Sequence, residues 1–136
     1  MKEAFADTGY WIALINPKDE LHAKVKSVSK KLGQVIIVTS EMVLTEFANY
    51  FSRYGNLRET AAKMTDDIRS NPNVQLIPQT SVQFQSALSL YRSHTDKQWS
   101  LTDCASIQIM RERKIQEALA CDVHFVQAGF RALLQE

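Results

Sequence analysis

The sequence predicts a single α/β domain, a three-layer αβα sandwich with a central, mainly parallel sheet, over residues 1–136. Three observations favour this class. Short apolar segments alternate with longer helical segments, one apolar segment is entirely β-branched, and glycine and proline are scarce, with 4 and 3 residues. Strands that alternate with helices imply right-handed crossovers and a parallel sheet that is covered on both faces.

Each strand is predicted from a short apolar segment. The clearest is 35–38, where four β-branched residues in a row are typical of a strand that is buried on both faces. The remaining strands are expected at 4–6, 74–77, 118–121 and, in the tail, 131–134.

The helices are predicted from apolar periodicity and from residues that begin helices. Thr39 or Ser40 can cap the helix that follows the β-branched strand. Capping-box patterns, in which an acid stands three residues after the capping residue, begin at Asn56 and at Ser100. The expected helical segments are a short turn at 10–15, then 20–32, 40–53, 56–70, 80–94 and 100–114.

Composition excludes several classes of protein. Hydrophobic residues make up 45% of the chain, which is enough for a core that needs no disulfide or structural metal. The formal net charge of +1 lacks the basic field of a protein that coats nucleic acid. No apolar stretch approaches the roughly 20 residues of a membrane span. Cys104 and Cys121 form no zinc or CxxC pattern, so we expect two buried free thiols and a reducing, cytoplasmic location.

Four acids are candidates for a common site. Asp7 and Asp122 each follow a predicted strand, and the carboxyl ends of parallel strands meet at one edge of a sheet. Asp103 lies on the apolar side of its helix, where a lone carboxylate is costly to bury. Glu46 lies at the edge of an apolar helical stripe. Each acid also has a purely structural interpretation: Asp7 and Asp122 as turn or cap residues, Asp103 as the end of a capping box, and Glu46 as a flanking residue.

Their combination favours a metal site. Carboxylates that are brought together raise each other's pKa unless a cation neutralises them. Hard divalent cations with oxygen ligands do so, and they also activate water and neutralise charge on a phosphoryl group. An acid cluster in a chain with only 3 histidines therefore indicates phosphodiester hydrolysis.

Four segments, in this order along essentially the whole chain, resemble the PIN-domain family, and they are most similar to the VapC-type toxins of prokaryotic toxin–antitoxin pairs. They are Asp7 to Gly9, Thr45 to Phe47, Ser100 to Cys104, and Asp122 to Phe125 followed by Ala128 to Phe130. Gly9, Ala120 and Cys121 depart from the hydroxyl-bearing residues that are common in the family at these positions.

The resemblance implies a PIN-like nuclease: an endoribonuclease that depends on Mg²⁺ or Mn²⁺ and cleaves RNA. It implies a metal site that consists of Asp7, Glu46, Asp103 and Asp122. Asp96, where many relatives carry a further acid, and Thr8, where relatives use a hydroxyl near the metal, are second-rank candidates. It also implies a homodimer and a cognate antitoxin protein as partner.

Two other functions stay open at this point. A haloacid-dehalogenase-like phosphatase also has an acid after its first strand, but it needs a second acid where Gly9 stands. A non-catalytic, receiver-like binding module needs adjacent acids early in the chain and a lysine at the end of a late strand, and neither is present. His124 shows no metal-ligand spacing, and we expect a surface histidine that could touch a phosphate.

Overall fold

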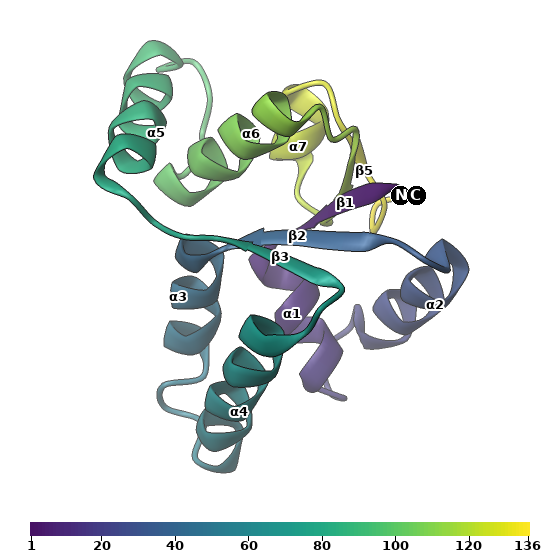
Figure 1. Cartoon of the computed structure of the whole chain (residues 1–136). Helices are drawn as coiled ribbons and strands as arrows, with labels where there is room; N and C mark the ends of the chain where they lie inside the picture. Colours follow the sequence, from purple (N-terminus) through teal and green to yellow (C-terminus); the bar gives the residue numbers. More distant parts are fainter.

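A five-stranded, all-parallel sheet forms the centre of the computed structural model, which describes residues 1–136 (Figure 1). The strands lie in the order β3-β2-β1-β4-β5. The direction of strand addition reverses at β1, so the carboxyl ends of β1 and β4 lie side by side at the switch point, where ligands bind in such sheets. The strands are β1 (Glu3–Ala6), β2 (Ile36–Ser40), β3 (Val74–Ile77), β4 (Glu117–Leu119) and β5 (Arg131–Ala132).

Helices cover both faces of the sheet, which confirms the three-layer αβα class. Figure 1 shows α1 to α4 on one side and α5 to α7 on the other. This division follows from right-handed crossovers, because the chain moves along the sheet in opposite directions before and after the switch point. The helices are α1 (Thr8–Ile15), α2 (His22–Leu32), α3 (Glu41–Tyr50), α4 (Asn56–Ser70), α5 (Ser81–Ser93), α6 (Leu101–Arg113) and α7 (Val123–Gln127).

The core fixes the end of β1, from which Asp7 projects. Ala4, Phe5 and Ala6 are fully buried, so both faces of the central strand are covered. Thr39 on β2 donates a 2.9 Å hydrogen bond to the carbonyl oxygen of Ala6, and its hydroxyl accepts a 3.2 Å bond from the indole N–H of Trp11. The last residue of β1 is thus tied to both β2 and α1.

No helix combines the length and the apolar character that crossing a membrane demands.

Two of the three capping residues predicted from local patterns are confirmed. Ser40 caps α3 by accepting a bond from the Val43 N–H at 3.2 Å, and Ser100 begins α6 in a capping box, as expected. The capping box at Asn56 is wrong, because Gly55 is the capping residue and Asn56 is already helical. Gly55 has φ +53°, a left-handed conformation that glycine adopts without strain, and the helix itself begins at residue 56, as expected.

The expected strand at 118–121 is shifted, and this changes the environment of one cysteine. β4 ends at Leu119, so Cys121 lies beyond the sheet and is exposed. Cys104, on the inner side of α6, is buried as predicted. The prediction of two buried thiols is therefore right for Cys104 and wrong for Cys121.

Candidate active site

Asp7 and Asp122 each stand just before a helix at the same edge of the sheet, and only Asp122 caps its helix through its side chain. Asp7 stands between β1 and α1, and its N–H donates a 3.2 Å bond to the carbonyl oxygen of Leu119 at the end of β4. Asp122 follows β4 and caps α7, where its side chain accepts a 3.0 Å bond from the His124 N–H. The strand topology brings these two acids together, as the sequence predicts.

Asp103 forms part of the cap of α6 and also lies at the acid cluster. Ser100 Oγ accepts a 3.0 Å bond from the Asp103 N–H, and Asp103 Oδ2 accepts a 3.0 Å bond from the Ser100 N–H. The residue is only 7% exposed. The structural interpretation is thus correct for Asp103 without excluding a role in the site, because a helix N-terminus also favours negative charge.

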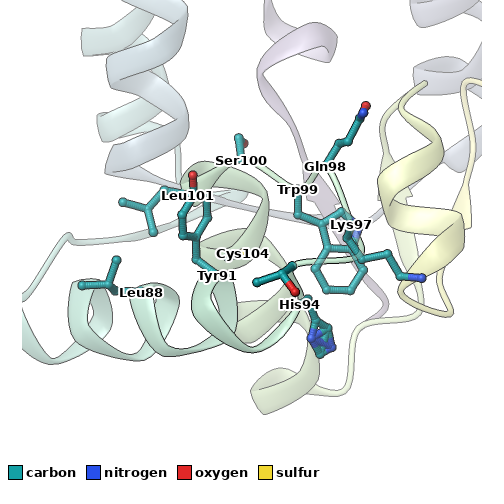
Figure 2. A pocket seen from close by; sticks show the side chains of 10 residues that line it. Leu88, Tyr91, His94, Lys97, Gln98, Trp99, Ser100, Leu101 and Cys104 are labelled. Atoms are coloured by element: carbon teal, nitrogen blue, oxygen red, sulfur yellow. The ribbon is translucent and has the colours of Figure 1, made fainter.

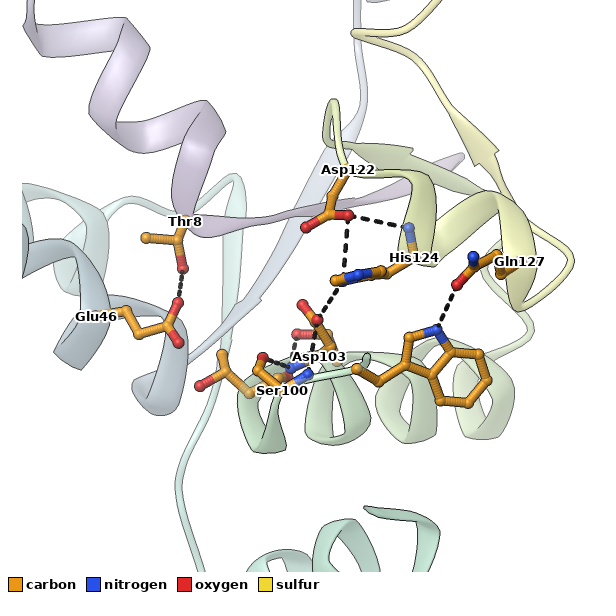
Figure 3. Close-up of polar contacts among 10 residues, drawn as sticks. Thr8, Glu46, Ser100, Asp103, Asp122, His124 and Gln127 are labelled. Carbon is orange, nitrogen blue, oxygen red and sulfur yellow. Dashed lines mark hydrogen bonds and ion pairs between the residues drawn. The ribbon is translucent and has the colours of Figure 1, made fainter. Parts of the chain in front are cut away.

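Glu46 reaches the group from α3. Its carboxylate accepts a 2.9 Å bond from the hydroxyl of Thr8, in the first turn of α1, and Figure 3 shows the two side chains meeting between the helices. Thr8 is buried, whereas Glu46 is exposed. The hydroxyl therefore holds an exposed acidic side chain beside the carboxyl end of β1.

The pKa of Asp7 is raised by its burial and by the acids around it. Burial is the largest cause that raises its pKa, to about 7 from 3.8, and the negative charges of Asp103, Glu46 and Asp122 raise it further. A hydrogen bond from the Thr8 backbone opposes the shift. The three other predicted acids thus lie close enough to act on Asp7, at the carboxyl end of β1.

His124 completes the group, and the expectation of a surface histidine is wrong. Its Nδ1 lies 2.7 Å from Asp103 Oδ2 and 3.1 Å from Asp122 Oδ1. The ring lies between the two carboxylates (Figure 3), and its side chain is 20% exposed. The only clue in the sequence is its position two residues after an acid that ends a strand and begins a helix.

Known proteins with a similar sequence decide the family. No protein-family model matches the chain. The 23S rRNA-specific endonuclease VapC20 of Mycobacterium tuberculosis, in strains CDC 1551 / Oshkosh and ATCC 25618 / H37Rv, is 31% identical over 126 residues, which cover 93% of this chain and 94% of VapC20. The chain belongs to the VapC-type toxin ribonucleases of the PIN-domain family.

The fold of this VapC-type chain is also that of a solved relative. The crystal structure of Mycobacterium tuberculosis VapC20, described as a Sarcin-Ricin loop cleaving toxin, matches it with a TM-score of 0.85 and 29% sequence identity. The match covers 95% of this chain and 97% of VapC20. Membership in this family removes the phosphatase and the receiver-like module as alternatives.

The donor set of the VapC-type chain fits a divalent cation. Carboxylate oxygens are the ligands that Mg²⁺ and Mn²⁺ accept, and crowding of the acids is the condition that a bound cation relieves. One ligand atom each of Asp103, Asp122 and His124 lie within 4.8 Å of one another. Asp7 and Glu46 add oxygen donors at the same edge of the sheet.

The structure does not bring Asp96 to this group. Its side chain is 70% exposed and forms a 3.2 Å ion pair with Lys97. The hydrogen bond from Lys97 is the main reason that the pKa of Asp96 is lowered, which is opposite to the change at Asp7. Of the two second-rank candidates, only Thr8 contacts one of the four acids.

Proposed function

We propose that this VapC-type toxin is an endoribonuclease that hydrolyses RNA phosphodiester bonds with a divalent cation, Mg²⁺ or Mn²⁺. Asp7, Glu46, Asp103 and Asp122 are the residues that would hold the cation. The observation that carries the proposal is the convergence on Asp7 of three further carboxylates, each of which raises its pKa. A site that is destabilised in this way by its own charge is suited to a cation and to the phosphate that the cation attracts.

When bound, the cation supplies positive charge for a phosphoryl oxygen and lowers the pKa of an attacking water molecule. The chain supplies rigid positioning. The capping box fixes one oxygen of Asp103, and the Thr8 hydroxyl orients the Glu46 carboxylate. Asp7 follows a fully buried strand, so its backbone cannot move without disturbing the core.

A cavity next to the Asp103 capping box is the place that we propose for the RNA strand. It has a volume of about 710 Å³ and lies between the carboxyl end of α5 and the start of α6 (Figure 2). Tyr91, which is half exposed, lines it together with Lys97, and unpaired bases stack on exposed aromatic side chains while lysine attracts phosphate. Ser100, which also lines the cavity, shares the capping box with Asp103.

The substitution Asp103→Asn tests the proposed chemistry. The amide oxygen of asparagine can still accept the bond from the Ser100 N–H, so the helix start should survive while one negative charge is lost. VapC20 is a 23S rRNA-specific endonuclease, so 23S ribosomal RNA is the first substrate to try. We expect no cleavage by the variant and an unchanged circular dichroism spectrum.

Asp66→Asn is the matched control, because Asp66 is an exposed carboxylate on α4 that pairs only with Arg69, at 4.0 Å. This variant should cleave RNA at the parental rate. Cleavage at the parental rate by Asp103→Asn would show that the acid cluster is not the catalytic site.

The partners that we propose are a second copy of the chain and a cognate antitoxin protein, with the cytoplasm as the site of action. Phe84 on α5 is an exposed aromatic side chain, which supports a protein contact on this helix. Light scattering of the purified chain should give the mass of a dimer, and Phe84→Glu should give that of a monomer. A monomeric parental chain would contradict the homodimer.

A further inference from the structure

His124 introduces a nitrogen donor into a group of acids that otherwise offers only oxygen. Its Nδ1 lies 2.7 Å from Asp103 Oδ2 and 3.1 Å from Asp122 Oδ1. Figure 3 shows the imidazole ring lying between the two carboxylates, with its nitrogen-bearing edge toward them. The contacts come from two separate elements, because Asp103 belongs to α6 and Asp122 caps α7.

We propose that His124 is a direct ligand of the divalent cation, together with Asp103 and Asp122, and that its nitrogen makes the site prefer a first-row transition-metal ion such as Mn²⁺ to Mg²⁺. This inference rests on the proposed divalent-cation site and specifies it further. It adds a fifth residue to the four acids and chooses between the two cations that the acids alone leave equivalent.

The spacing of the three donors agrees with one shared ion. In an octahedral site with ligands at about 2.1 Å from the ion, neighbouring ligand atoms lie about 3 Å apart. The two nitrogen–oxygen separations at His124 have this size. One ligand atom from each of the three residues lies within 4.8 Å of the others, so a small closure of Asp103 toward Asp122 would place all three donors around one ion.

The imidazole is also held in place. The backbone N–H of His124 donates to Asp122 Oδ1 at 3.0 Å, so two of the proposed ligands are joined directly. The next residue, Phe125, is fully buried and anchors α7 in the core. Gln127, at the end of α7, accepts a 3.1 Å bond from the indole N–H of Trp99. A donor on so short a helix is thus fixed at both ends, as a metal ligand needs to be.

Nitrogen distinguishes between the candidate ions. Mg²⁺ is a hard cation that prefers oxygen and keeps several waters. Mn²⁺ also accepts oxygen ligands, but it is the first member of the transition-metal series whose affinity for nitrogen donors rises toward copper, so a nitrogen ligand disfavours it less than it disfavours Mg²⁺. The simpler alternative is that His124 only orients the Asp103 carboxylate through a hydrogen bond. Both roles fit the same distances, but only direct ligation puts the nitrogen in contact with the ion.

Electron paramagnetic resonance of bound Mn²⁺ separates the two roles. Mn²⁺ is added to chelator-treated protein, and pulsed spectra are recorded for coupling to a directly bonded nitrogen nucleus. We expect ¹⁴N coupling in the parental protein that changes to ¹⁵N coupling when the histidines are labelled with ¹⁵N. This labelling experiment needs no substitution, so it does not depend on whether a variant folds.

Titrations of variants test the preference. His124→Gln should lose the nitrogen coupling and bind Mn²⁺ about tenfold more weakly, while its affinity for Mg²⁺ changes much less. His22→Gln is the matched control, since His22 Nδ1 contacts the carbonyl oxygen of Ala13 and lies at the start of α2. This control should retain the coupling and the parental affinity for both ions.

Bound Mn²⁺ without histidine nitrogen coupling would overturn the proposal and leave His124 a positioning residue. Equal losses of Mn²⁺ and Mg²⁺ affinity in His124→Gln would overturn the preference. Cleavage of RNA is scored separately from binding. A parental protein that shows the coupling but cleaves no RNA would support the ligand and count against the proposed function instead.

Discussion

The hydroxyl of Thr8 donates a 2.9 Å hydrogen bond to the carboxylate of Glu46, across two helices that are far apart in the sequence. Thr8 begins α1 directly after Asp7, and Glu46 lies in the middle of α3. The bond therefore joins the exposed side chain of Glu46 to the first residue after Asp7, which follows the fully buried strand β1.

Removal of this hydroxyl should weaken cation binding. Thr8→Val keeps the shape of the side chain but lets Glu46 turn toward solvent, and we expect the affinity for Mn²⁺ or Mg²⁺ to fall about tenfold, as is typical when the partner of a metal ligand is lost. Thr8→Ser retains the donor and should bind as the parental chain does. Isothermal titration calorimetry measures both, and equal affinities in all three proteins would show that the bond does not position Glu46.

Asp7 should make the cation-free protein less stable as the pH rises. Its pKa in the folded chain is about 7, above the ordinary value of 3.8, so folding favours the protonated form. The stabilisation is complete below about pH 4 and is lost between about pH 4 and 7, by up to roughly 4 kcal/mol. In chelator, Asp7→Asn should therefore exceed the parental chain in free energy of unfolding above pH 7.

Urea unfolding at pH 4, 6 and 8 measures this difference. Excess Mn²⁺ at pH 8 should stabilise the parental chain and have little effect on Asp7→Asn, because the substitution removes a charged donor. A difference between the two proteins that stays constant over this pH range would contradict the raised pKa of Asp7.

The two thiols should differ sharply in reactivity. Cys121 is exposed beyond the end of β4, whereas Cys104 is buried in α6, and burial with the nearby charge of Asp103 raises the pKa of the Cys104 thiol. Only the thiolate attacks a disulfide reagent, so we expect one fast-reacting thiol in the native chain and a second after unfolding. Cys121→Ser should abolish the fast phase, and a fast phase that persisted would mean that Cys104 is accessible.

Local patterns predicted the elements wherever short-range chemistry decides. Residues 36–38 of the β-branched segment lie in β2, and Ser40 and Ser100 cap the helices that follow them. The prediction failed at Asn56 because the backbone freedom of Gly55 takes precedence over a side-chain cap. It failed at Cys121 because an apolar run can continue past the point where strand pairing stops.

At the site, too, local patterns predicted some contacts and long-range packing decided the others. Strand topology alone brings Asp7 beside Asp122, so their proximity followed from the order of the elements. The sequence places His124 next to the acids, but its contact with Asp103 was not predicted because that residue lies on another helix. Only packing of α7 against α6 brings the two residues together.

The strand order has a consequence for synthesis of the protein. β1 emerges first, yet β4, which pairs with it and carries the chain to Asp122, comes from the last twenty residues. Asp122 and His124 are therefore made only after β1, β2, β3 and the helices between them. The acid cluster stays incomplete until β4 has been synthesised and has paired with β1.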